Sequence, residues 1–239
     1  MYSRKSNIYC LNCGKVGHLQ SRCLFPINSW GIICVSYIKP VCLLVNDITI
    51  RNPVDDNRLL LNKFKNDLKF ILIKRKNSLC FVEFMRGRYY FDNLQYIHTM
   101  VSKMSIDEQV SLLKNSFNDL WCRMWNIETI NKSHTVEYSA SYIKFNKIVG
   151  GVTCYFNKKI PVFTTLAQII SNNKSIYGEP EWEIPKGRKN SKEDELDCSN
   201  REFFEETNIS AGRYSMVFAE NHLTEKYIGS DGVVYKNNY

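Results

Sequence analysis

Short apolar runs near the start of the chain predict strands. Residues 31 to 38, GIICVSYI, are apolar and rich in β-branched side chains, as in a buried strand. Residues 68 to 79 predict a second strand, which is expected to pair with the first. Residues 25 to 30, FPINSW, are expected to form a short linker, and residues 39 to 67 an elaborated loop.

The middle of the chain follows helical spacing instead. Residues 92 to 104 predict one helix, and Ser105 with Glu108 forms a capping box that opens another, running to Trp125. Apolar side chains of the second helix recur at Val110, Leu113, Phe117, Leu120, Trp121 and Met124. This spacing gives the helix a wide apolar face.

Weaker signals complete the pattern. Residues 137 to 149 and 164 to 172 are helix candidates, so we expect an inserted helical subdomain with Trp121 and Trp125 in its core. Strand-like segments follow at residues 182 to 184, 214 to 228 and 233 to 239.

One later stretch combines a loop with a helix. Pro185 and Gly187 end the strand-like WEI segment. Ser191 with Asp194 three positions on predicts the start of a helix over residues 192 to 207, where nothing breaks a helical pattern.

Three carboxylates share one face of that helix. Glu202, Glu205 and Glu206 stand at positions i, i+3 and i+4. Like charges at this spacing destabilise a helix slightly, and a divalent cation that prefers oxygen ligands, Mg²⁺ or Mn²⁺, would reverse that cost. Taken alone, the three glutamates are also compatible with a solvated acidic face.

The whole stretch from Gly187 to Ile209 resembles the Nudix box, G-x5-E-x7-R-E-U-x-E-E-x-G-U, in which U is aliphatic or aromatic. Every fixed position matches except the last glycine, which is Asn208 here. Asparagine is the residue that best tolerates the left-handed backbone common after a helix, so this departure is mild.

The resemblance implies a Nudix α/β/α fold with a cation site. It implies that the cation ligands are Gly187, through its carbonyl, and Glu202, Glu205 and Glu206. Arg201 and Glu193 would pair to hold the box together, and Lys186 lies close enough in sequence to contact a phosphate. A solvated lysine is the alternative for Lys186.

A second chemical motif lies near the N-terminus. The segment CLNCGKVGHLQSRC places cysteine and histidine at the spacing C-x2-C-x4-H-x4-C, as Cys10, Cys13, His18 and Cys23. Such ligands suit tetrahedral Zn²⁺, and Gly14 and Gly17 allow so short a loop to fold around an ion.

This segment resembles the CCHC zinc knuckle, a module that binds single-stranded nucleic acid. The usual aromatic residue is missing, and Leu11 and Leu19 would offer apolar surface to a base instead. A structural zinc staple without nucleic-acid contact is the alternative.

Charge and cysteine usage point to a basic protein of a reducing compartment. The chain has 239 residues, a formal net charge of +8 and 13% aromatic residues, which suits a polyanion such as RNA. Basic residues surround the knuckle and the entry to the insertion, at Arg4, Lys5, Lys15, Arg22, Lys74, Arg75, Lys76, Arg86 and Arg88. With nine cysteines, no visible secretory signal and no long apolar run, we expect a cytoplasmic protein that does not enter a membrane.

A second resemblance covers roughly Trp30 to Tyr239. SLCFVEFMRGRYYF, a helix ending in DLWCRMW, and EWEIPKGR leading into the box occur in the order found in viral Nudix mRNA-decapping enzymes, those of poxviruses and, more closely, African swine fever virus. In that family a helical domain interrupts the Nudix fold. The knuckle lies outside this resemblance, and residues 39 to 67 are longer than the family implies.

The sequence therefore predicts an α+β protein in four parts. These are a zinc knuckle at 1 to 27, the first part of a Nudix fold at 28 to 78, a helical insertion that is an RNA-binding candidate at 79 to 175, and the second part of the Nudix fold at 176 to 239. Nudix folds end with a further strand and helix that do not follow Tyr239, so we expect a truncated chain or a fragment.

The function implied by the resemblance is metal-dependent hydrolysis of the pyrophosphate in the 5′ cap of mRNA, releasing m7GDP and 5′-monophosphate RNA. The knuckle and insertion would bind the RNA body, so removal of residues 1 to 27 should weaken action on long capped RNA more than on a free cap analogue. Aromatic candidates for stacking on the methylated base are Phe81, Phe84, Tyr89 and Tyr90.

Two alternatives stay open. One is a Nudix pyrophosphohydrolase for small molecules, such as nucleoside diphosphate derivatives or diphosphoinositol polyphosphates. The other is an inactive Nudix scaffold that acts as an RNA-binding protein.

Overall fold

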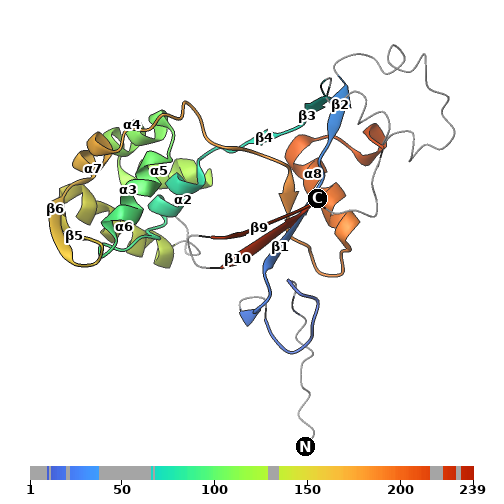
Figure 1. Cartoon of the computed structure of the whole chain (residues 1–239), viewed down its shortest axis with the longest axis horizontal. Coiled ribbons are helices and arrows are strands. Elements are labelled where there is room, and N and C mark those ends of the chain that lie inside the picture. Colours follow the sequence, from blue (N-terminus) through green and yellow to red (C-terminus); the bar gives the residue numbers. More distant parts are fainter. Residues whose placement is uncertain are drawn as a thin grey trace, which may run out of the picture. The chain divides into compact units, whose positions relative to one another are not determined.

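The computed structural model describes residues 10, 12 to 19, 22 to 37, 66, 68 to 128, 135 to 215, 223 to 229 and 233 to 239. They form helices and several small sheets, which confirms the mixed α+β class (Figure 1). The chain divides into two compact units: unit 1 is Met1–Ile73 with Glu183–Tyr239, and unit 2 is Lys74–Trp182. The four-part division is finer than this and stays a prediction, and the loop expected over 39 to 67 lies outside the described residues except for Asn66.

A four-stranded sheet organises unit 1. Its strands, in spatial order, are β8 (Lys186–Gly187), β1 (Ile27–Gly31), β10 (Val234–Asn238) and β9 (Thr224–Ile228). β1 runs parallel to β10, with Ile27 opposite Tyr235, and antiparallel to β8, with Trp30 opposite Gly187. β9, β10 and β1 lie side by side in Figure 1. The strand expected at residues 233 to 239 is confirmed by β10.

The linker expected at residues 25 to 30 is wrong in most of its length, because β1 begins at Ile27. This segment mixes polar and apolar residues, and backbone pairing on both sides makes it a strand despite its weak pattern. The strand expected over 31 to 38 is shorter, as β2 (Val35–Tyr37), and it pairs with β3 (Leu68–Phe70) as predicted.

The second predicted strand, over 68 to 79, is likewise broken up. After β3 the chain forms the short strand β4 (Ile73–Lys74), which pairs with β7 (Trp182–Glu183), and a helix begins at Leu79.

The helix with the three glutamates is α8 (Glu195–Thr207). Its N-cap is Asp194, whose side chain accepts a hydrogen bond from the Asp197 backbone N–H, so the expected start at Ser191 is wrong. Lys192 adopts a positive φ of 66°, which places the preceding residues in a turn. At the other end Asn208 adopts the left-handed conformation, as its place in the motif predicts.

Helices and one hairpin make up unit 2. They are α2 (Leu79–Met85), α3 (Leu94–Ser102), α4 (Ile106–Lys114), α5 (Phe117–Trp125), α6 (Thr135–Gly150), α7 (Leu166–Asn172) and the hairpin of β5 (Val152–Phe156) and β6 (Ile160–Thr164). None of the helices among the described residues is long and apolar enough to cross a membrane.

The helices expected at 92 to 104, 137 to 149 and 164 to 172 are confirmed, and so is the capping box of Ser105 and Glu108. The single helix expected over 105 to 125 is wrong. The Ser116 side chain accepts a hydrogen bond from the Asp119 backbone N–H and caps a new helix, so the helix is interrupted between α4 and α5.

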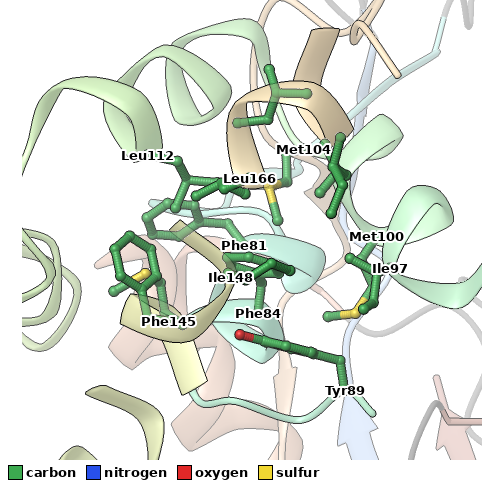
Figure 2. Close-up of a cluster of buried hydrophobic side chains, with 14 of the residues drawn as sticks. Phe81, Phe84, Tyr89, Ile97, Met100, Met104, Leu112, Phe145, Ile148 and Leu166 are labelled. Atoms are coloured by element: carbon green, nitrogen blue, oxygen red, sulfur yellow. The ribbon is translucent and has the colours of Figure 1, made fainter. Parts of the chain in front are cut away.

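A hydrophobic core lies within unit 2 (Figure 2). Phe81 and Phe84 from α2 meet Ile97 and Met100 from α3, while α4, α6 and α7 add Leu112, Phe145, Ile148 and Leu166. Trp121 is fully buried as predicted, and Trp125 packs against the core as a partly buried side chain. Val110 and Leu113 are exposed instead, because α4 buries the face that carries Glu108, Gln109 and Leu112.

Candidate catalytic and zinc-binding sites

Glu202 and Gly187 are in close contact. A Cβ atom added to Gly187 would overlap the carboxylate of Glu202, so any larger residue at this position would require that carboxylate to move. Gly187 lies in β8 and is held opposite Trp30 of β1. The sheet and α8 thus bring a backbone segment and a carboxylate together at the first and middle positions of the motif.

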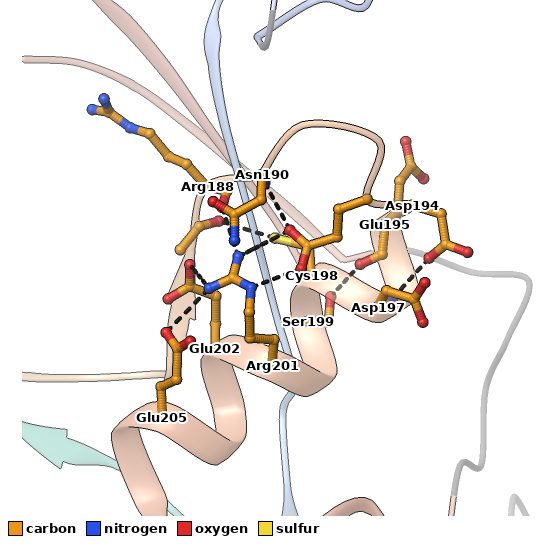
Figure 3. A network of polar contacts seen from close by, with 12 residues as sticks. Arg188, Asn190, Asp194, Glu195, Asp197, Cys198, Ser199, Arg201, Glu202 and Glu205 are labelled. Atoms are coloured by element: carbon orange, nitrogen blue, oxygen red, sulfur yellow. Dashed lines mark hydrogen bonds and ion pairs between the residues drawn. The ribbon is translucent and has the colours of Figure 1, made fainter.

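Arg201 is the centre of a polar network around this contact (Figure 3). Its guanidinium donates to both carboxylate oxygens of Glu193, with Nε–Oε1 2.7 Å and Nη2–Oε2 2.9 Å. Nη1 donates to Glu202 (2.8 Å) and Glu205 (3.1 Å), and Nη2 also donates to the carbonyl oxygen of Arg188 (2.9 Å). Hydrogen bonds from Arg201 lower the pKa of Glu193 to about 2.

The third glutamate of the face has a different partner. Glu206 accepts a hydrogen bond from the backbone N–H of Lys186 at 2.9 Å. The Glu206 side chain is exposed as a whole, yet desolvation of its carboxyl raises its pKa, and the negative charges of Glu183 and Glu202 add to the rise against the opposing effect of the Lys186 amide. The ammonium of Lys186 pairs with Glu183 at 2.7 Å, so Lys186 is not a freely solvated lysine.

The three carboxylates are therefore adjacent but held apart. Arg201 binds Glu202 and Glu205, while the Lys186 amide binds Glu206. Among the described residues, only the four knuckle residues form a group of at least three His, Cys, Asp or Glu side chains whose ligand atoms all lie within 4.8 Å of one another. The carboxylates of Glu202, Glu205 and Glu206 are not that close together. The donors around α8 are all oxygen atoms, which in type fit Mg²⁺ or Mn²⁺.

Cys198 is a residue of this region that the sequence reasoning missed. Its side chain is buried, and its thiol lies 3.7 Å from the carbonyl oxygen of Gly187. Burial, with the nearby charge of Glu193, raises the pKa of this thiol to about 12. Cys198 is therefore a protonated packing residue and not a nucleophile.

The four knuckle residues converge as predicted. The ligand atoms of Cys10, Cys13, His18 and Cys23 lie within 4.8 Å of one another, and Cys13 Sγ is 3.3 Å from His18 Nε2. Gly14 and Gly17 take positive φ values of 72° and 112°, as a loop this tight requires. The donor set and its compact geometry fit a tetrahedral zinc ion.

Asn12 was not identified from the sequence, yet it makes several contacts at this site. Its side-chain amide donates to Cys23 Sγ at 3.2 Å. Desolvation opposes ionisation of Cys23, but hydrogen bonds from Asn12 and His18 outweigh it and lower the pKa of the thiol to about 6. A thiolate is the form that binds zinc, so these neighbours favour the ligand state.

The predicted nucleic-acid contacts of the knuckle have mixed outcomes. Leu19 is 53% exposed, as a base-contacting side chain must be. Leu11, Arg4 and Lys5 lie outside the described residues. Lys15 places its ammonium 4.4 Å from the ring centroid of Phe25.

Most of the aromatic candidates for cap stacking are excluded by burial. Phe81, Phe84 and Tyr89 belong to the core of unit 2 and are at most 3% exposed, so that expectation is wrong for them. Phe81 and Phe84 lie on the buried face of α2, and the Tyr89 ring stacks on that of Phe84. Tyr90 is 72% exposed, and the ammonium of Lys144 lies 5.1 Å from its ring centroid.

Comparison with known proteins identifies viral homologues. A protein of Acanthamoeba polyphaga mimivirus, named provisionally as an mRNA-decapping protein, is 29% identical over 292 aligned positions, covering 99% of this chain and 80% of that protein. The mRNA-decapping protein g5R of African swine fever virus is 30% identical over 158 residues, 66% of this chain. The chain spans 59% of the length of the g5R protein. No protein-family model matches the chain.

Proposed function

We propose that this homologue of viral mRNA-decapping proteins hydrolyses the pyrophosphate in the 5′ cap of mRNA, releasing m7GDP and 5′-monophosphate RNA. The observation that carries the proposal is the arrangement of α8 against β8, with the Glu202 carboxylate against Gly187 and the Glu206 carboxylate bonded to the Lys186 backbone N–H. The names of the mimivirus and African swine fever virus homologues support capped mRNA as the substrate class.

In this proposal Glu202, Glu205, Glu206 and the carbonyl of Gly187 hold Mg²⁺ or Mn²⁺. The cations, when bound, would neutralise phosphate charge and make water a stronger nucleophile. One of the three glutamates accepts the proton of the attacking water. Arg201 orients two of these side chains and is itself fixed by its two bonds to Glu193.

Lys186 is the proposed phosphate contact. Its backbone N–H donates a hydrogen bond to Glu206, and its ammonium pairs with Glu183. Lys186 and Gly187 are neighbours in the short strand β8. A positive charge at this place would bind the leaving diphosphate or the bridging phosphate.

The RNA body would bind through unit 2 and the knuckle, in the cytoplasm of an infected cell. Support comes from the net charge of +8, which persists although the proposed catalytic helix is acidic. For single-stranded RNA, the logarithm of the binding constant should fall with the logarithm of the salt concentration, and each phosphate contact should contribute about −0.7 to that slope.

The test uses RNA carrying a labelled phosphate in its cap, with products separated by chromatography. We expect m7GDP in the presence of Mg²⁺ or Mn²⁺ and none after chelation. Release of m7GMP, or no release from any capped RNA, would contradict the proposal.

Two comparisons separate the alternatives. Faster turnover of nucleoside diphosphate derivatives or diphosphoinositol polyphosphates than of capped RNA would favour the small-molecule enzyme. RNA binding without hydrolysis of any diphosphate would favour the inactive scaffold. Stimulation of cleavage by a long RNA body over a cap dinucleotide would support the decapping enzyme.

A further inference from the structure

Asn12 connects the zinc-ligand loop to the sheet of unit 1. Its Oδ1 accepts a hydrogen bond from the backbone N–H of Asn28 at 3.0 Å, and its Nδ2 donates to the carbonyl of Pro26 at 2.9 Å. The same Nδ2 lies 3.2 Å from Cys23 Sγ. A backbone N–H can only donate and a carbonyl can only accept, so these partners fix which end of the amide faces which group.

The contact with Asn28 matters because Asn28 belongs to β1. Two residues further along this strand, Trp30 pairs with Gly187, and Gly31 pairs with Lys186. A continuous series of bonds and pairings therefore runs from a zinc ligand, through Asn12 and β1, to the segment that carries Gly187. Every member of this series lies in unit 1.

We propose that Asn12 is a positioning residue that couples the zinc site to β1, so that the bound metal stabilises both the ligand loop and the strand on which β8 is paired. The proposal rests on zinc binding by the Cys₃His group. Residues that orient a metal ligand by hydrogen bonds commonly change metal affinity by about 10–100-fold when they are removed. One side chain here bonds both a ligand and the sheet.

This coupling changes the expected role of the knuckle. Separate functions for knuckle and core imply that removal of residues 1 to 27 spares cleavage of a free cap analogue. Coupling through Asn12 implies instead that loss of zinc disturbs β1 and slows small and long substrates together.

The first experiment measures zinc affinity of the full chain by competition with a chromogenic chelator. Asn12→Asp retains the acceptor for the Asn28 N–H but cannot donate to Cys23 or Pro26, and Asn12→Ala removes both functions. We expect zinc to bind about 10–100-fold more weakly to both variants than to the wild type, with one zinc per wild-type chain. The matched control is Asn146→Asp, which removes an exposed bond to the carbonyl of Tyr142 in α6 and should leave zinc affinity unchanged.

The second experiment needs no substitution. Hydrogen exchange of the wild-type chain is compared with zinc bound and after chelation. We expect amides of Ile27–Gly31 to exchange at least about tenfold faster without zinc, while the helices of unit 2 keep their protection.

The outcomes test the coupling separately from the proposed cap hydrolysis, because neither zinc affinity nor hydrogen exchange depends on that reaction. A wild-type chain that binds no zinc would overturn both zinc binding and the coupling. Normal zinc affinity in both Asn12 variants would overturn the coupling alone. Unchanged protection of β1 after zinc removal, or equal loss in both units, would also overturn it.

Discussion

Every side chain of the buried hydrophobic cluster belongs to unit 2, whereas the buried apolar side chains described in unit 1 are those of Cys10, Pro185, Cys198 and Phe203. Unit 2 is thus stabilised by packing of large side chains, each worth about 1.5–3 kcal/mol when fully buried. Unit 1 depends more on strand pairing, the Arg201 network and the knuckle ligands. Polar contacts impose precise geometry, which is what the proposed site for charged substrates would require.

The largest effect is expected from breaking the core of unit 2. Trp121 is fully buried, and its ring contacts those of Phe117, Trp125 and Tyr138. Trp121→Ala should lower the free energy of unfolding by about 3–5 kcal/mol, because it leaves a cavity that the neighbours cannot fill. Urea unfolding measures this, with Phe163→Ala as the control. Phe163 is 68% exposed, so its loss should cost less than about 1 kcal/mol, and equal costs would refute the contrast.

The next largest effect is a loss of catalytic activity with little change in thermal stability. Glu205→Gln and Glu206→Gln should each reduce cap hydrolysis by about 100- to 1000-fold, or about 2.7–4 kcal/mol in transition-state binding. Their thermal melts should stay close to that of the wild type, because relief of repulsion among three adjacent negative charges is of the same order as the exposed ion pair with Arg201 that Glu205 loses.

Glu195→Gln is the matched control for these variants. It makes the same charge change in the first turn of α8, about two turns before Glu202, and should retain activity. Full activity in both Glu205→Gln and Glu206→Gln would remove the basis for the cation site.

A smaller effect tests how the Arg201 network supports unit 1. Glu193→Gln should cost about 1.5–3 kcal/mol of stability at pH 7, since it removes charged hydrogen bonds to Arg201. The pKa of Glu193 is lowered from 4.5 to about 2, so the contribution is present above pH 4.5 and is lost as the pH falls towards 2. Urea unfolding of both proteins between these pH values should show the difference shrinking, and a difference independent of pH would argue against the ion pair.

The smallest effect is expected at the end of α8. Asn208 has φ 58° and donates its backbone N–H to the carbonyl of Phe204 at 2.7 Å. Asn208→Gly should change stability by less than about 0.5 kcal/mol, whereas Asn208→Ala should lose about 1 kcal/mol from left-handed strain. Thermal melts of the two variants compare them directly, and equal stability would show that the left-handed conformation carries no cost here.

Local signals predicted the elements that depend on local physics. The capping box of Ser105 and Glu108, the helices expected at 92 to 104, 137 to 149 and 164 to 172, and the left-handed Asn208 follow from neighbouring residues alone. The same is true of the knuckle, whose ligands lie close together in sequence.

Elements that depend on distant partners were missed or misplaced. β1 is a strand because β10 and β8 pair with it, and FPINSW carries little strand pattern of its own. The position of Asn12 is another case, since an asparagine in a loop has many possible partners before the fold is known. The hairpin of β5 and β6 was also missed, because its turn uses Asn157 and Lys158 at positive φ instead of glycine.

The split of unit 1 along the chain has a consequence for how the protein is made. Asn238 of β10 bonds the carbonyl of Ser29 in β1 across 209 positions, so β1 must wait for almost the whole chain before its parallel partner leaves the ribosome. At about 5–20 residues per second, that delay is on the order of 10–40 s. Unit 2 is contiguous and can fold during this interval.

Its two ends then lie together, with the Arg75 backbone N–H bonded to the Glu181 carbonyl at 3.0 Å and Lys74 paired with Glu179. Once unit 2 has folded, its two ends are held close together, so the chain between β1 and β8 behaves as a much shorter loop. The entropic cost of joining β1 to β8 and β10 falls accordingly. We therefore expect the helical insertion to assist the folding of the sheet that it interrupts.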